Sequence, residues 1–140
     1  MDFKKVNNNW ILKINKGEQI ASSIKDFCKK NNIKLASISG IGAATDIKIG
    51  YFNLNTKVYN EKVFTDKYEV TSLLGNVTTK DNEPYLHLHI TFSDEDCTTY
   101  GGHFVEGTIS GTSEIFLTVF DGEVGRYVDS DTGINVMDLK

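Results

Sequence analysis

The sequence predicts an α+β protein in which one main helix packs on a mostly antiparallel sheet of seven or eight strands. Only residues 18–31 carry apolar side chains at helical spacing. Most of the remaining chain consists of apolar or alternating runs separated by polar or glycine-containing turns, which is typical of strands. The length of 140 residues suits one domain, and no repeat or linker interrupts it. We therefore expect a single domain over residues 1–140.

The helix is predicted by an apolar stripe at positions i, i+4, i+7 and i+8, formed by Ile20, Ile24, Phe27 and Cys28. Glu18 near its start and Lys29 and Lys30 near its end suit the helix dipole. The pair Asn31-Asn32 should end it, because asparagine tolerates the left-handed conformation found after many helices.

The strands are expected in order along the chain. Glycine-containing turns are expected at residues 40–44 and 111–113, a kink or bulge at Gly75 and a polar turn at residues 79–84. Residues 126–140 are predicted to be a polar tail. The expected strands are residues 10–14, 33–39, 46–54, 57–63, 67–79, 84–92, 100–109 and 114–120.

Composition narrows the function classes. The net charge is −4 with a single arginine, and the lysines are scattered. Nucleic-acid binders usually carry a basic face, so composition argues against direct DNA binding. No run approaches the ~18 apolar residues of a membrane span, and the first residues lack a signal-peptide pattern. With only two cysteines, Cys28 and Cys97, and no disulfide framework, a cytoplasmic protein is expected.

All three histidines lie within seventeen residues. His87 and His89 are two apart in a predicted strand, so both imidazoles should leave the same face. A turn at residues 93–98 folds the chain back and sets His103 opposite position 88 or 89. In one register the three imidazoles converge; in the other, shifted by one residue, His103 points to the opposite face. The sequence leaves both registers open.

Converging imidazoles are good ligands for zinc and similar ions, and three of them with one open position suit a hydrolytic zinc site. Glu106 or Glu114 would then serve as a base or as a partner of the ligands. Gly101 and Gly102 would let backbone approach a ligand or another subunit, or would simply form a bulge. The alternative is that the histidines pack on a half-buried sheet face and hydrogen-bond to backbone or to a neighbouring subunit.

Four motifs occur in order along the chain, at residues 36–43, 84–89, 101–103 and 133–138. Their order and spacing closely resemble the prokaryotic stand-alone form of the plants-and-prokaryotes-conserved (PPC) domain. The resemblance implies an antiparallel sheet with a packed helix, assembling as a homotrimer. In plants the similar domain lies beside AT-hooks that bind DNA, but this chain has no Arg-Gly-Arg-Pro core of such a motif. Cys97 also stands where relatives often have a turn glycine, which predicts a different turn or a strained residue.

The leading hypothesis is therefore a homotrimeric PPC-domain protein with a DNA-binding or regulatory role, acting as a binding or scaffold module more than as an enzyme. The competing hypothesis is a zinc-type hydrolase or small-molecule-binding protein that uses His87, His89 and His103. A third is an assembly module that binds another protein through a sheet edge. None of the three involves a membrane.

Overall fold

The computed structural model describes residues 1–140 and contains one helix and nine strands. No helix is long and apolar enough to cross a membrane. The elements in chain order are β1 (Asp2–Val6), β2 (Asn9–Lys13), α1 (Ile20–Lys30), β3 (Ala36–Asn53), β4 (Val58–Phe64), β5 (Tyr68–Lys80), β6 (Glu83–Ser93), β7 (Thr99–Val119), β8 (Gly125–Val128) and β9 (Asn135–Asp138).

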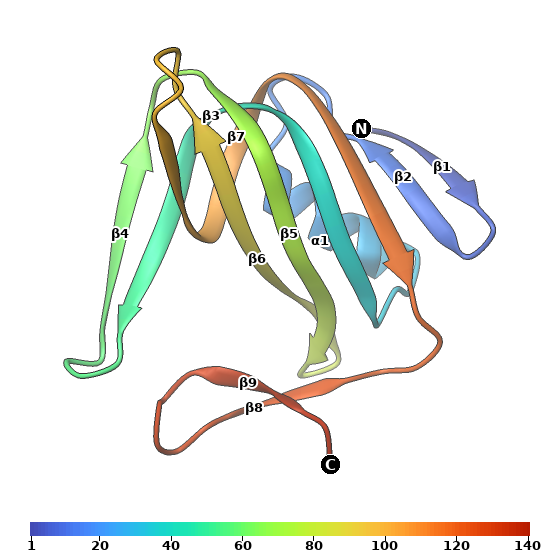
Figure 1. Cartoon of the computed structure of the whole chain (residues 1–140). Coiled ribbons are helices and arrows are strands. Elements are labelled where there is room, and N and C mark those ends of the chain that lie inside the picture. The colour runs from blue at the N-terminus through green and yellow to red at the C-terminus, as the bar shows by residue number, and fades with distance from the viewer.

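The main sheet is antiparallel and has seven strands in the order β1-β2-β7-β6-β5-β3-β4. Strand β7 pairs with β6 near its start and with β3 along most of its length, so β3, β5, β6 and β7 form a closed ring of pairings. Helix α1 lies on one side of this sheet, and the β8–β9 hairpin lies across its lower end in Figure 1. The predicted α+β fold is confirmed.

Helix α1 buries the predicted stripe, since Ile20, Ile24, Phe27 and Cys28 are all in the core. It begins two residues later than expected and ends before Asn32, whose φ of 53° is left-handed. Glu18 lies outside the first turn, which contains no acidic residue. Its carboxylate instead accepts hydrogen bonds from the Met1 amino group and the Asn15 N–H.

The core consists of 23 buried apolar residues. Strand β6 contributes Leu88, Ile90 and Phe92, each at most 2% exposed. Because alternate residues of a strand face opposite sides, this burial directs His87 and His89 to the other face. Burying one such side chain contributes about 1.5–3 kcal/mol, so a slip of β6 by one residue would lose several times that amount.

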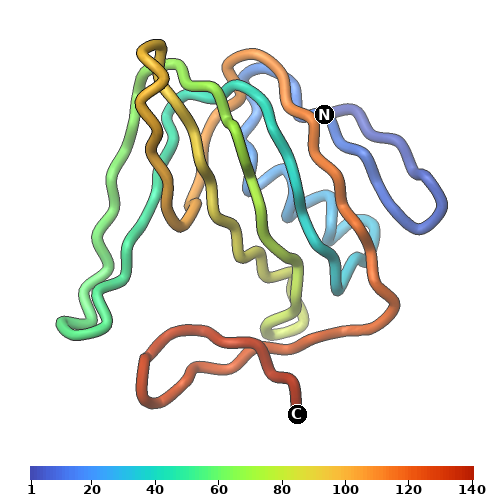
Figure 2. The backbone as a smooth tube through the Cα atoms, viewed as in Figure 1, coloured from blue at the N-terminus to red at the C-terminus, as the bar shows by residue number.

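Strands β3 and β7 are continuous, with 18 and 21 residues, so the turns predicted at residues 40–44 and 111–113 are wrong (Figure 2). Glycine serves a different purpose there. A Cβ at Gly42 would lie 2.4 Å from the carbonyl oxygen of Thr112. The two strands approach closely at that point, where their register also shifts. Glycine is required for this close approach and does not turn the chain.

The β5–β6 connection also differs from the prediction. It is the tight turn Asp81-Asn82, both with positive φ, and not a six-residue segment. The register shift in β5 lies between Val70 and Ser72, so the bulge predicted at Gly75 is wrong. A Cβ at Gly75 would lie 2.0 Å from the carbonyl oxygen of His87. Gly75 therefore allows β6 to lie close against β5 where the first histidine projects.

Two elements at the chain ends were not predicted. Strand β1 pairs with β2 around Asn7, which has positive φ. Residues 126–140, predicted to be a tail, contain most of the β8–β9 hairpin. The Thr79 N–H donates to the carbonyl oxygen of Val124, and the side chain of Arg126 reaches β5. These contacts hold the hairpin against the strand that pairs with β6.

Candidate metal centre

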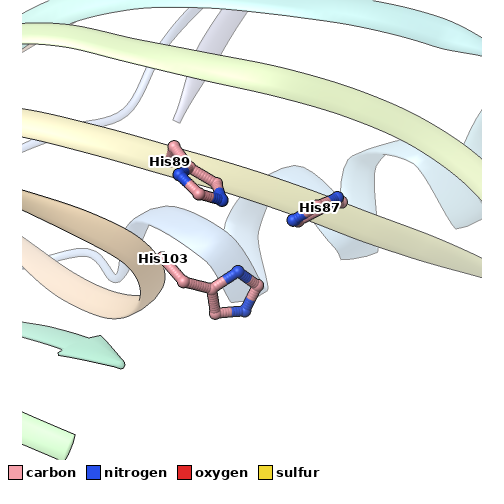
Figure 3. A group of neighbouring side chains, drawn as sticks. All are labelled: His87, His89 and His103. Atoms are coloured by element: carbon pink, nitrogen blue, oxygen red, sulfur yellow. The ribbon is translucent and has the colours of Figure 1, made fainter. Parts of the chain in front are cut away.

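Strands β6 and β7 bring the three histidines of one chain together. The pairing sets His103 directly opposite His89, so the structure has the converging register of the two that the sequence left open. The potential ligand nitrogens all lie within 4.8 Å of one another. Ring centroids are 5.2 Å apart for His87 and His89, 5.2 Å for His87 and His103, and 5.5 Å for His89 and His103. Figure 3 shows the imidazoles gathered in one place.

Gly101 and Gly102 lie just before His103 and allow its strand to pack closely. A Cβ at Gly101 would lie 2.9 Å from the carbonyl oxygen of Ile90, and one at Gly102 would lie 3.2 Å from Ile49. Both glycines thus permit a close approach by strands of the same chain. The turn before them contains Cys97 with a φ of 61°, the strained conformation expected where relatives have glycine.

Burial favours the neutral form of two of the imidazoles, those of His87 and His103. Loss of solvent lowers the pKa of His87 to about 4, with further lowering by His103, His89 and Arg126. Burial, and then His89, also lowers the pKa of His103. A neutral imidazole has a free lone pair, which is the form that binds a metal. The donor set therefore fits a zinc-like ion held by three nitrogens with a further position open.

The two predicted glutamates are not part of the cluster. The Glu106 carboxylate accepts hydrogen bonds from the backbone N–H groups of Ala21 and Ser22, at 2.8 and 3.0 Å, and from that of Gly107 at 3.0 Å. It thus satisfies the free donors at the start of α1. Glu114 lies on an exposed part of β7, opposite Ile41 of β3.

A cavity of about 390 Å³ adjoins the cluster and is lined by His87 and His103. Its other walls come from the β3–β4 hairpin, the start of β6 and the β8–β9 hairpin. Sequence reasoning missed these residues, although Arg126 is the only arginine and residues 133–138 are one of the four motifs. They are Phe52, Tyr59, Tyr85, Arg126, Gly133, Ile134 and Asn135.

Arg126 is fixed in place at this cavity. Its Nε donates to Thr78 Oγ1 at 2.7 Å, Nη1 to the Asn135 carbonyl oxygen at 3.1 Å and Nη2 to Asn76 Oδ1 at 3.0 Å. Its guanidinium lies over the ring of Tyr85, 4.6 Å from the centroid. Asn76 is the cross-strand partner of His87, so Arg126 is hydrogen-bonded to β5 directly beside the histidine cluster.

Fold and site together define a class: an antiparallel sheet protein with one packed helix and a three-histidine centre on the outer face of the sheet. Residues 1–121 match the family model of the Plants and Prokaryotes Conserved (PCC) domain, also abbreviated PPC. The chain belongs to this family, as the resemblance of its motifs implied. No curated protein matches the chain.

Solved structures agree with this assignment. A PPC protein from Pyrococcus horikoshii is 35% identical with a TM-score of 0.86, covering 99% of this chain and 96% of that one. A protein from Bacteroides thetaiotaomicron, described as a proposed DNA-binding protein, is 33% identical with a TM-score of 0.96, covering 98% and 96%. A protein from Archaeoglobus fulgidus, described as metal-containing, is 30% identical with a TM-score of 0.88, covering 98% of each chain.

Proposed function

We propose that this protein is a metal-dependent small-molecule-binding protein whose ion, zinc or a similar divalent metal, is held by His87, His89 and His103. The observation that carries the proposal is the convergence of three imidazoles within 4.8 Å beside a cavity. The metal-containing relative from Archaeoglobus fulgidus supports it independently.

The chemistry of the residues supports this assignment. Histidines at i and i+2 on one strand face, with a third across the hairpin, form a chelate whose geometry the sheet fixes before the ion arrives. A metal with three protein ligands can take a ligand atom or a water in its remaining position, and can lower the pKa of that water. The same ligands would serve a hydrolase, which is the catalytic form of the proposal.

Elemental analysis of the purified, untagged protein tests the metal site. We expect about one ion per chain in the wild type, since the site provides three imidazole nitrogen ligands. His87→Ala and His103→Ala should each abolish the bound metal. Thr91→Ala is the matched control, because Thr91 is exposed and lies on the same face of β6. The proposal would be refuted if either histidine variant kept as much metal as the wild type. It would also be refuted if the wild type held no metal after reconstitution with Zn²⁺.

A second candidate function is a DNA-binding or regulatory role as a homotrimeric scaffold. The Bacteroides relative favours the DNA part, while the net charge of −4 opposes direct contact. Exposed Leu74 and Phe116 both pair with Ser39 and so lie on one face of the sheet, with exposed Ile41 nearby on β3. Such an apolar patch supports self-association, and the trimer itself rests on the family resemblance.

Two measurements test this candidate. Phe116→Glu should convert a trimer to monomers in sedimentation, because it places a charge in the apolar patch; a wild-type monomer would reject the trimer. Binding to an A·T-rich duplex should weaken by at least about tenfold from 50 to 200 mM salt if phosphates are contacted. Absence of any binding at low salt would reject direct DNA contact.

We also propose that residues 1–140 act as one domain and that the protein works in the cytoplasm. The continuous core of 23 residues supports the first proposal. The free cysteines Cys28 and Cys97, of which Cys97 is exposed, support a reducing compartment.

A further inference from the structure

We infer that the cavity beside the histidines binds a small organic anion, a carboxylate with an apolar or aromatic body, whose carboxylate is held by Arg126. The inference rests on the proposed function, because it names the class of small molecule that the metal centre would act with. It follows from the charge, the free hydrogen-bond donors and the walls of the cavity.

The charge of the cavity is unbalanced. Arg126 is the only lysine, arginine, aspartate or glutamate that lines it. Its three hydrogen-bond acceptors are a hydroxyl, an amide oxygen and a backbone carbonyl, all neutral. None of the five ion pairs of the chain involves Arg126. A half-buried cation without a carboxylate partner favours an anion from outside the chain.

Arg126 also has donors to spare. A guanidinium has five N–H groups, and its three hydrogen bonds leave one N–H on each terminal nitrogen. Two such groups on one planar fork suit the two oxygens of a carboxylate. Because Thr78, Asn76 and Asn135 already fix the side chain, little conformational entropy is lost when the anion binds.

The walls favour an organic ligand over an inorganic ion. Phe52, Tyr59, Tyr85 and Ile134 supply aromatic and aliphatic surface around the single cation. The volume of about 390 Å³ is within the range of small-molecule sites. His87 and His103 lie on the same cavity, so a ligand held by Arg126 would also lie beside the metal.

A purely structural arginine would explain less. Arg126 does hold the β8–β9 hairpin against β5, but neutral donors could make the same three hydrogen bonds. Lys57 is a cation that contacts the same hairpin without lining the cavity. Its Nζ donates to the carbonyl oxygens of Asp131 and Thr132.

The test is calorimetric titration of the zinc-loaded protein with benzoate, its neutral analogue benzamide, and inorganic phosphate. We expect benzoate to bind at least about tenfold more tightly than benzamide, because charge-assisted hydrogen bonds to a guanidinium are worth that much. Arg126→Gln should remove this preference. Arg126→Lys, which keeps the charge but not the fork, should retain part of it and covers the case in which Arg126→Gln disrupts the hairpin. Lys57→Gln is the matched control and should bind benzoate as the wild type does.

Zinc content measured on the same samples separates the two proposals. No zinc in the wild type refutes the metal site, and benzoate binding that depends on Arg126 in that protein would still support the anion site. Bound zinc with equal affinities for benzoate and benzamide, or with benzoate affinity unchanged in Arg126→Gln and Arg126→Lys, overturns the inference. Phosphate binding as tightly as benzoate, with the same dependence on Arg126, overturns the organic part of it.

Discussion

Glu106 of β7, which contacts the start of α1, and Arg126 in the β8–β9 hairpin are both half-buried charges without an ion-pair partner. They differ in how completely the chain satisfies them. Both oxygens of Glu106 accept backbone N–H groups, whereas Arg126 keeps two N–H groups and lines a cavity. The comparison teaches that a charge matched by its own backbone stabilises the fold, while a charge with donors left over is available to a ligand.

Of the two charges compared, Glu106 should have the larger effect on stability when it is replaced, in Glu106→Ala. Losing the acceptor for two N–H groups at the helix start, and for that of Gly107, should lower the free energy of unfolding by about 2 kcal/mol, measured by urea denaturation. Metal content should not change. Glu114→Ala is the control and should change stability by less than about 0.5 kcal/mol, because Glu114 is exposed. Loss of metal in Glu106→Ala without loss of stability would place Glu106 in the site and contradict the comparison.

The stability of the metal-free protein should also depend on pH. The folded-state pKa of His87 is about 4 against an ordinary value of 6.5, so between these values the unfolded chain binds more protons. This contribution to stability is fully present above pH 6.5 and is lost as the pH falls toward 4.

Urea midpoints measured across that range should fall more steeply for the wild type than for His87→Gln. Identical slopes would contradict a pKa of His87 lowered by burial.

Arg126→Gln should raise the pKa of His87 only slightly in an NMR titration, because burial is the largest cause of the lowering and Arg126 the smallest.

The smallest effect on global stability is expected from Arg126→Gln, which should cost less than about 1 kcal/mol because the hairpin lies outside the core. Its effect should be local. Amide hydrogen exchange should accelerate in β8 and β9 and not in β6 or β7. Exchange that accelerates equally in all four strands would mean that Arg126 supports the whole sheet, as Glu106 supports the helix.

Local pattern predicted the features whose cause is local. The stripe of α1 and the alternation of β6 follow from burial of one face, so the helix and the common face of His87 and His89 were predictable. The choice between the two registers was not, because it depends on how β6 and β7 pack around Gly101 and Gly102. Gly42 was misread as a turn residue because its close neighbour, Thr112, is seventy residues away in sequence.

The role of Arg126 was hidden for the same reason. Its partners Asn76 and Thr78 precede it by about fifty residues, and β8 and β9 are too short and too exposed to show an alternating pattern. Glu106 was predicted for the site from its nearness to His103 in sequence, whereas its partners lie on α1. For both charged residues, distance along the sequence did not indicate which groups they contact.

The β8–β9 hairpin supplies Arg126 and Asn135 to the cavity but lies beyond residues 1–121, the part that matches the family model. The three histidines belong to the shared sheet. The proposed metal ligands and the arginine of the proposed anion site thus come from separate stretches of the chain. A change in the hairpin can therefore alter one wall of the cavity while the three histidines stay in place on the main sheet.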